Sequence, residues 1–479
     1  MPGQTPTGRI PTGGSTAGGS NAGGFTAGGS TAGTSAAAWS GPVQWTNWAG
    51  NQSASGVVQA HPSGTAEIAQ VIERARAEGR RVRPVGSGHS FTAIARPDLR
   101  AVQLLLDRHA DVVSLDAAAG LVTVAAGMPL HRLNAMLSAA GLAMTNLGDI
   151  DRQTISGATS TGTHGTGARF GGIATQLRGL ELVLADGSVL ACSAEQNPDV
   201  FAAARIGLGA LGIVSTVTLA VEPLFALHAQ EGPARLEETL DRFDEWTDEV
   251  DHVEFYWFPH TRMTSVKRNT RRPLNAGPLE PLPRWRGWLD DELLSNSVFG
   301  AVVGLGRRAP ATVRPMAQVA ARALSPRSFT DLSYRVFTSP RRVRFQEMEY
   351  AVPRAALLPA LQEVVAAVEA SDLRVAFPVE VRVAAADDIT LSTASGRDSG
   401  YVAVHLPAGA DTTAYFALVE RIMSSHEGRP HWGKLHALDA QVLSTRYPRF
   451  AEFVALRDRL DPDGLFRNEY LDRVLGTGQ

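Results

Sequence analysis

The chain has 479 residues, more than one hydrophobic core usually serves, so two folded domains are expected. Hydrophobic residues make up 44% of the chain and charged residues 19%, and the net charge of −3 gives no electrostatic attraction to nucleic acids or anionic membranes. Cys192 is the only cysteine, which excludes a disulfide framework within the chain and a cysteine-based metal site, and no apolar run suggests an integral membrane segment. These properties predict a cytoplasmic protein, with a peripheral membrane position as the alternative.

Residues 1–43 are predicted to be a disordered tail. They repeat Gly, Ser, Thr and Ala and contain almost no large apolar side chains. Such a segment cannot bury enough surface to offset the entropy that it would lose on ordering. It also lacks the basic and apolar regions of a secretory signal, so we assign it no function.

Residues 44–223 are predicted to form one mixed α+β domain. Apolar spacing indicates a helix over Thr65–Gly79, with Thr65 as its N-cap, and a short strand, Val82–Val85, follows it. A second helix is expected between Pro129, at its first position, and Gly141. Further strands are expected at 122–125, in a hairpin over 180–190 that turns at Asp186-Gly187, and at 213–221.

Residues 224–479 are predicted to form a second domain in which helices and strands alternate. Phe255–Phe258 has the composition of a buried strand, whereas residues 270–290 are rich in Pro, Arg and Trp and predict a long irregular loop. A helix is expected around 358–370, and strands are expected at 379–383 and 401–405.

Two loops rich in Gly, Ser and Thr are the clearest signs of a ligand site. The first contains Gly86, Ser87, Gly88, His89 and Ser90, and the second covers residues 160–167. Closely spaced backbone N–H groups and hydroxyls in such loops can bind a phosphate-bearing ligand. Considered alone, His89 is more simply explained as a turn residue that bonds to its own loop.

Residues 207–212 match the pattern GxGxxG, which is typical of nicotinamide-dinucleotide sites. A true site follows a strand and opens a helix, because the pyrophosphate lies at the helix N-terminus. Here the glycines precede a predicted strand, and no acidic residue stands at the required distance. We therefore reject nicotinamide binding by this motif.

Glu380-Val381-Arg382 is the strongest catalytic candidate. Residues two apart on a strand project from one face, so the carboxylate and the guanidinium should lie side by side. An exposed ion pair of this kind would be common and of little value. The apolar neighbours Phe377 and Val379 instead indicate a buried strand, where a charged pair is costly and more typical of a functional site.

With these loops, the Glu380-x-Arg382 pair and the run His431-Trp432-Gly433-Lys434, the chain resembles the FAD flavoproteins of the vanillyl-alcohol-oxidase type. Within them it is similar to the aldonolactone oxidoreductases, from about Trp45 to Leu475. The resemblance implies an α+β, two-domain FAD-binding fold of the PCMH type. The second domain would be an α/β substrate or cap domain whose C-terminal segment returns to the flavin site.

The resemblance also implies which residues bind FAD. His89 matches the histidine that in many relatives attacks the flavin C8 methyl and becomes covalently attached, while other relatives bind FAD without this bond. The positions that match the family's cofactor site are Gly86, Ser87, Gly88, His89, Ser90, Gly148, Asp149, Thr154, Ser156, Gly157, Thr161, Gly162, Thr163, His164, Ile213 and His431.

The catalytic residues implied by the resemblance are Glu380, Arg382, Lys434 and His405. Hydride would pass from a substrate C–H to flavin N5, while Arg382 and Lys434 stabilise the developing alkoxide. Glu380 would orient the hydroxyls and accept the proton, directly or through His405. No metal is required.

The implied substrate is an aldono-1,4-lactone, L-gulono-1,4-lactone or D-arabinono-1,4-lactone, oxidised at its C2 hydroxyl. Alditol oxidase is the alternative, but Pro407 stands where those enzymes carry a Thr, and Asp149 stands where they carry a small hydroxyl residue. Residues 146–150 and 345–350 also look more like the lactone branch. A flavin-binding protein without turnover is a further alternative, against which the complete catalytic set argues.

The electron acceptor is expected to be oxygen or a redox partner such as a quinone or a cytochrome. Plant-type dehydrogenases of the family carry an Ala that blocks oxygen near the flavin, and Gly148 stands at that position here. The sequence therefore favours an oxidase, with a dehydrogenase as the alternative.

Overall fold

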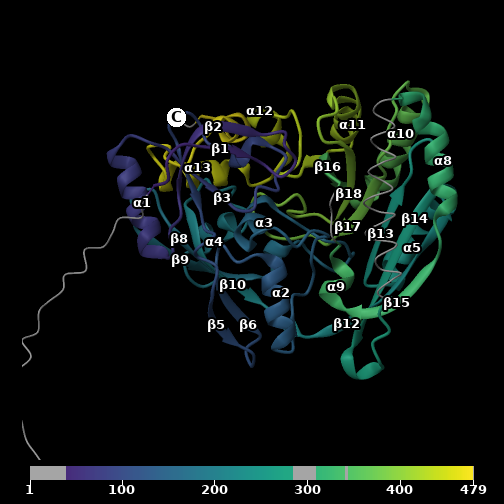
Figure 1. Cartoon of the computed structure of the whole chain (residues 1–479), viewed down its shortest axis with the longest axis horizontal. Coiled ribbons are helices and arrows are strands. Elements are labelled where there is room, and N and C mark those ends of the chain that lie inside the picture. Colours follow the sequence, from purple (N-terminus) through teal and green to yellow (C-terminus); the bar gives the residue numbers. More distant parts are fainter. Residues whose placement is uncertain (1–38, 284–308, 340–342, 478–479) are drawn as a thin grey trace, which may run out of the picture. The chain divides into compact units, whose positions relative to one another are not determined.

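The computed structural model describes residues 39–283, 309–339 and 343–477 (Figure 1). Most of the predicted tail therefore lies outside the described residues. Trp39 already pairs with Ala60, and the Ser40 N–H donates to the Gln59 carbonyl at 2.8 Å, so the order begins before residue 44. Among the described helices, none is long and apolar enough to cross a membrane.

Two sheets and four short helices form most of the first half. A four-stranded sheet has the order β1-β2-β4-β3, and a five-stranded sheet has the order β5-β6-β10-β8-β9. The strands are β1 (Val43–Thr46), β2 (Ser53–Ala60), β3 (Val82–Val85), β4 (Val102–Leu105), β5 (Val112–Asp116), β6 (Leu121–Ala125), β8 (Leu177–Val183), β9 (Val189–Ser193) and β10 (Ile213–Ala220). The helices are α1 (Thr65–Ala77), α2 (Leu130–Ala139), α3 (Ile155–Thr161) and α4 (Pro198–Ala204).

The first helix, α1, forms because its apolar residues recur on one face and are buried there. The predicted N-cap was wrong: Gly64 occupies that position. The Thr65 hydroxyl instead bonds outside the helix, 2.6 Å from Ser215 Oγ and 2.9 Å from Glu181 Oε1. Pro129 likewise lies at the N-cap of α2 rather than at its first helical position.

An eight-stranded sheet dominates the second half, in the order β15-β12-β14-β13-β17-β18-β16-β19. Its strands are β12 (Phe225–Arg235), β13 (His252–Trp257), β14 (Met263–Pro273), β15 (Arg327–Leu332), β16 (Phe345–Pro353), β17 (Val379–Ala384), β18 (Ser399–Pro407) and β19 (Arg429–Pro430). Helices α5 (Leu236–Glu249), α10 (Leu357–Ala370) and α11 (Thr413–Ser425) pack against it (Figure 1). Two further helices are α8 (Val313–Ala323) and α9 (Ser333–Phe337).

The prediction of an irregular loop over 270–290 is wrong for residues 270–273, which belong to strand β14. Strand β14 continues to Pro273 because it pairs with β12 along its whole length. A short 3-10 turn, Leu274–Ala276, follows it. Residues 284–290 of the prediction lie outside the described residues.

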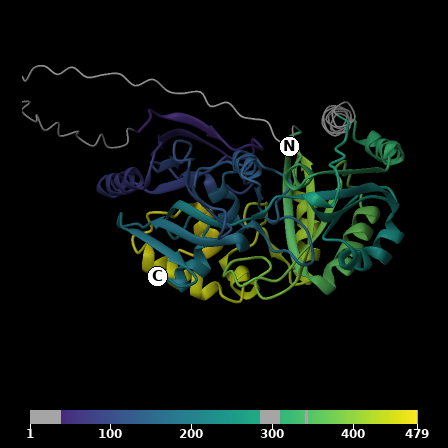
Figure 2. The ribbon, with the colours of Figure 1, turned by 90° about the horizontal axis from the view of Figure 1, so that it is seen from below.

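Two large hydrophobic clusters match the two predicted halves, except at the C-terminus. One cluster draws on residues between 60 and 221 and on others between 389 and 475, while the second draws on residues between 236 and 423. The C-terminal helices α12 (Ala440–Arg446), α13 (Phe450–Leu460) and α14 (Glu469–Leu475) lie beside strands of the first half (Figure 2). The Val82 N–H donates to the Leu465 carbonyl at 2.8 Å. The boundary at 223/224 itself stays a prediction.

Candidate active site

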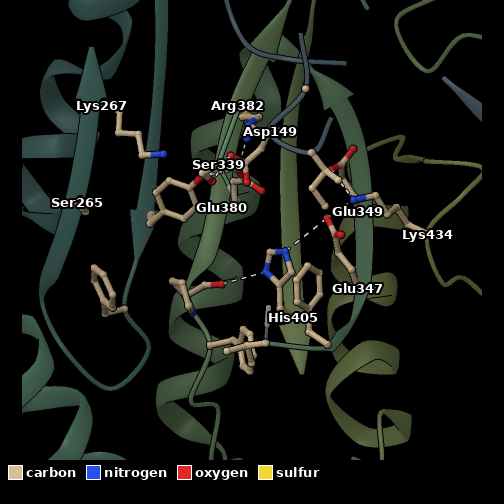
Figure 3. Close-up of a pocket in the computed structure, with 18 of the residues that line it drawn as sticks. Asp149, Ser265, Lys267, Ser339, Glu347, Glu349, Glu380, Arg382, His405 and Lys434 are labelled. Atoms are coloured by element: carbon tan, nitrogen blue, oxygen red, sulfur yellow. Dashed lines mark hydrogen bonds and ion pairs between the residues drawn. The ribbon is translucent and has the colours of Figure 1, made fainter. Parts of the chain in front are cut away.

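A cavity of about 520 Å³ lies between the glycine loops of the first half and the strands of the large sheet. Strands β13, β14, β16, β17 and β18 each contribute side chains to it (Figure 3). The predicted site residues that line it are His89, Ser90, Gly148, Asp149, Thr161, Thr163, His164, Glu380, Arg382, His405, His431 and Lys434. All four predicted catalytic residues thus face one cavity.

Glu380 and Arg382 project from β17 into this cavity, and each is only 8% exposed. Arg382 Nη2 lies 2.5 Å from Glu380 Oε1, and Arg382 Nε donates to Glu254 Oε2 at 2.7 Å. Burial alone would lower the pKa of Arg382, but the carboxylates of Glu254 and Glu380 raise it well above its ordinary value. The guanidinium is therefore a fixed positive charge.

Lys434 lies on the opposite side of the cavity, against two carboxylates of β16 (Figure 3). Its ammonium contacts Glu347 directly and lies 3.8 Å from Glu349 Oε2. Burial would lower the pKa of Lys434, yet these carboxylates raise it above 10.5. Burial alone would also raise the pKa of Glu347, but Lys434 and His405 lower it to about 2. The pair is therefore ionised at neutral pH.

Three histidines complete the wall. His405 Nε2 lies 3.5 Å from Glu347 Oε1, and its Nδ1 lies 3.2 Å from the Pro378 carbonyl. His164 Nε2 lies 2.6 Å from Glu349 Oε1, and its Nδ1 lies 2.8 Å from the Gly165 carbonyl. His431 is different, because its Nδ1 accepts the Gly433 N–H at 3.0 Å and burial lowers its pKa to about 4.

The buried histidines lead to a prediction about acid stability. Burial lowers the pKa of His252 and His431 to about 4 and that of His436 to about 3. The unfolded chain therefore takes up protons before the folded protein does as the pH falls below about 6.5. Each of these histidines then lowers the free energy of unfolding by up to about 1.4 kcal/mol per pH unit. We expect the melting temperature to fall between pH 7 and pH 5, before the Glu347 carboxylate titrates. A melting temperature that stayed constant over this interval would contradict the expectation.

Several charged or polar residues of the cavity were missed in the sequence. They include Glu254, Tyr256, Lys267, Glu347 and Glu349, which line or border the same cavity. For the four residues other than Lys267 a signal was available: two acids, or one acid and one tyrosine, two positions apart in an otherwise apolar strand.

Lysine usage gives a second sign that this cavity is functional. The sequence contains 45 Lys and Arg residues, of which only two, Lys267 and Lys434, are lysine. Both line the cavity, and both bond a buried glutamate. Arginine serves at every other cationic position, so the compact ammonium is confined to this one site.

A second, narrower cavity of about 100 Å³ lies along the first glycine loop. The two cavities share His89, Ser90, Gln153 and Thr161, so an elongated ligand can extend from one to the other. The predicted cofactor residues that line the narrow cavity are Gly86, Ser87, Gly88, His89, Ser90, Thr154, Ser156, Gly157, Thr161 and Ile213. Gly162 lines neither cavity, and it ends α3 in the left-handed conformation, with φ at 82°.

The narrow cavity has the walls that a diphosphate requires. A Cβ at Gly86 would lie 2.3 Å from Thr154 Oγ1, so only glycine allows this close approach. Ser156 and Thr161 donate their hydroxyl protons to the carbonyls of Ala126 and Gly157. Their side chains thus shape the loop, and the backbone amides of the first glycine loop are suited to hold an anion. These features fit FAD.

The rejected GxGxxG motif also lies here. Leu208, Gly209 and Gly212 line the narrow cavity, although they precede β10 as the sequence indicated. Arg83 holds this loop by donating to the Leu208 and Gly209 carbonyls at 2.9 and 3.1 Å. The motif therefore belongs to the wall of the narrow cavity.

One group of possible metal ligands was not expected. Within the described ranges, Glu347, Glu380 and His405 bring ligand atoms to within 4.8 Å of one another. Lys434 and Arg382 already compensate the two carboxylates. That no metal is needed stays our prediction.

Residues 217–474 match the D-arabinono-1,4-lactone oxidase family, and residues 57–193 match the FAD binding domain family. The chain belongs to the D-arabinono-1,4-lactone oxidase family. The predicted resemblance and the predicted FAD cofactor are thereby confirmed, and so is the class of FAD-linked oxidoreductases.

Three relatives align with this chain over nearly their whole length. An L-gulono-1,4-lactone dehydrogenase of Mycobacterium tuberculosis is 42% identical over 435 residues, covering 90% of this chain and 99% of the relative. An L-gulonolactone oxidase of Mus musculus is 34% identical, with 90% and 98% covered. An alditol oxidase of a Streptomyces species is 30% identical, also with 90% and 98% covered.

The fold is shared more widely. The crystal structure of a cholesterol oxidase from B. sterolicum is similar with a TM-score of 0.77 at 17% identity, covering 91% of this chain and 97% of that chain. This likeness concerns the fold alone, and it confirms the predicted α+β, two-domain FAD-binding architecture.

Proposed function

We propose that this protein oxidises the C2 hydroxyl of an aldono-1,4-lactone, L-gulono-1,4-lactone first and D-arabinono-1,4-lactone second. This proposal rests on one observation: the Glu380 carboxylate and the cations Arg382 and Lys434 face the same cavity beside the glycine loops. FAD supplies the hydride acceptor. The names of the relatives support the lactone as substrate.

Different side chains stabilise the developing charge and accept the proton. Arg382 and Lys434 stabilise the negative charge that develops on the substrate oxygen. Glu380 orients the hydroxyl and accepts its proton. His405 lies beside Glu347, with its Nε2 3.5 Å from Glu347 Oε1, so we place it as an indirect participant.

Anaerobic titration of the purified protein with L-gulono-1,4-lactone tests this function, with the visible flavin band as the readout. Bleaching of the band is the expected result. If the lactones leave the band unchanged and xylitol or sorbitol bleaches it, the protein acts on alditols. No bleaching by any of them would support a flavin-binding protein without turnover.

For the acceptor we propose oxygen first, and a quinone or a cytochrome second. A Cβ at Gly148 would lie 3.1 Å from both the His164 carbonyl oxygen and Thr163 Cγ2, so an alanine here would fill space that the glycine leaves open. Rapid recolouring of the bleached protein in air would identify an oxidase, and persistent bleaching would identify a dehydrogenase. The cytoplasm, or a peripheral position at a membrane, remains the proposed location.

A covalent bond between His89 and the flavin is also part of this proposal. His89 lies where the two cavities meet, it stacks on Trp48 at 5.4 Å, and burial lowers its pKa to about 4. The ring is therefore neutral and nucleophilic at pH 7. We expect denatured wild-type protein to keep its yellow colour and denatured His89→Ala protein to lose it. His426→Ala, outside the cavity, is the matched control, and a colourless wild-type precipitate would contradict the bond.

A further inference from the structure

The Tyr256 hydroxyl connects Glu380 to Glu254, a buried carboxylate that pairs with Arg382 and Lys267. Tyr256 lies directly opposite Glu380 in the pairing of β13 with β17, and Glu254 lies directly opposite Lys267 in the pairing of β13 with β14. The Tyr256 hydroxyl lies 2.7 Å from Glu380 Oε1 and 3.1 Å from Glu254 Oε1. Two carboxylates thus face one phenol proton.

Glu254 is held firmly in its place. Arg382 Nε donates to Glu254 Oε2 at 2.7 Å, and Lys267 Nζ lies 3.0 Å from Glu254 Oε1. The two carboxylates Glu254 and Glu380 are balanced by the two cations Arg382 and Lys267, so this group is neutral as a whole. In Figure 3 the Lys267 ammonium points toward the strand that carries Glu380 and Arg382. Such compensation offsets part of the cost of burying these charged groups.

The phenol keeps its proton throughout. Burial and the charges of Glu254 and Glu380 raise the pKa of Tyr256 well above 10. It can therefore donate one hydrogen bond and accept another, but it does not ionise at neutral pH. Its hydroxyl can donate to either carboxylate, and the contact to Glu380 is the shorter of the two.

We propose that Tyr256 is a positioning residue that follows the protonation of Glu380 by turning its hydroxyl between Glu380 and Glu254. This inference rests on the proposed function, in which Glu380 accepts the substrate proton. While Glu380 is a carboxylate, the phenol donates to it and fixes its orientation. After Glu380 has taken the proton, the phenol donates to Glu254 and its oxygen accepts the new O–H of Glu380.

The step is balanced. The substrate O–H bond and the adjacent C–H bond break, the proton goes to Glu380, and the hydride with its electron pair goes to the FAD. Tyr256 begins and ends neutral, and Glu254 remains ionised. Lys267 and Arg382 hold Glu254 as the second acceptor, which explains why one of the two lysines of the chain lies here.

Tyr256→Phe tests the proposal, and Tyr415→Phe is the matched control. The Tyr415 hydroxyl on α11 is buried and has no hydrogen-bond partner among the described residues, so its removal breaks no bond. In anaerobic stopped-flow reduction by the lactone, Tyr256→Phe should lower the limiting rate about 10- to 100-fold, the range expected for a hydrogen bond to a charged group. The apparent Kd for the lactone should change by less than about threefold.

Changes at Lys267 extend the test. Lys267→Met should lower the limiting rate in the same direction as Tyr256→Phe, while Lys267→Arg, which keeps the charge beside Glu254, should restore part of it. A Tyr256→Phe protein that is reduced at the wild-type rate would overturn the proposal. A loss confined to the lactone Kd would overturn it as well, since the residue would then serve binding alone.

A double-mutant cycle on the melting temperature tests the coupling between Tyr256 and Glu380 without any substrate. Tyr256→Phe and Glu380→Gln should each lower the melting temperature by about 1–3 °C, and the double variant should lower it by less than the sum of the two. The effects of Tyr415→Phe and Glu380→Gln on the melting temperature should be additive. If no lactone reduces the wild type, the proposed function fails, yet this cycle still decides on the coupling. Additive effects for Tyr256 and Glu380 would overturn the proposal.

Discussion

Glu380→Ala is expected to lower the limiting rate of flavin reduction by about 10²-fold or more while FAD stays bound. The carboxylate faces the 520 Å³ cavity and does not line the narrow cavity that fits the diphosphate. Removing it leaves Arg382 paired with Glu254, so the guanidinium keeps one carboxylate partner. Anaerobic stopped-flow absorbance at the flavin band measures the rate, and the flavin-to-protein ratio measures binding.

Glu363→Ala is the control for this change, because Glu363 is an exposed glutamate that pairs with His426 outside the cavity. It should match the wild type in both rate and flavin content. Glu380→Gln should keep the shape of the site and still lose most of the rate, since the amide cannot accept the substrate proton. Undiminished turnover in Glu380→Ala would remove Glu380 from the proposed chemistry.

Lys434→Met is expected to lower the limiting rate by about 10²- to 10³-fold, as for other groups that stabilise a developing oxyanion. It should also destabilise the protein, because Glu347 and Glu349 are buried and share this ammonium. Breaking a buried pair from one side typically costs about 3–5 kcal/mol. Thermal unfolding and stopped-flow reduction measure the two effects separately.

The double variant Lys434→Met, Glu347→Gln separates structure from chemistry. Neutralising Glu347 removes the stranded charge, and Glu349 keeps its contact with His164 at 2.6 Å. We expect the melting temperature to recover most of its loss while the rate stays low. Recovery of both would show that Lys434 acts only as a structural counter-ion.

The sequence was most predictive where local spacing carries the information. Glu380 and Arg382 could be placed on one face because residues two apart on a strand share a side, and apolar neighbours indicated burial. Their partners could not be predicted in this way. Tyr256 reaches Glu380 only through the register of β13 with β17, which joins positions 124 residues apart.

Other differences between the predictions from sequence and the structure also arise from contacts between residues far apart in the chain. Thr65 is a residue type preferred at the N-cap, but its hydroxyl bonds Ser215 and Glu181 on neighbouring strands instead. The glycines of 207–212 lie before a strand, as the sequence indicated, and the rejection of a nicotinamide site stays a prediction. Their place beside the first glycine loop depends on Arg83, whose bonds to the Leu208 and Gly209 carbonyls no local pattern indicates.

The scarcity of lysine has a practical consequence for chemistry on this protein. An acylating reagent would find only two side-chain amines in this sequence, Lys267 and Lys434, and both lie in the cavity with 22% and 21% of the side chain exposed. The extent of their acylation in a peptide map would therefore report the occupancy of the cavity directly. Compounds that protect both positions could be ranked by mass spectrometry, without turnover and without a dye.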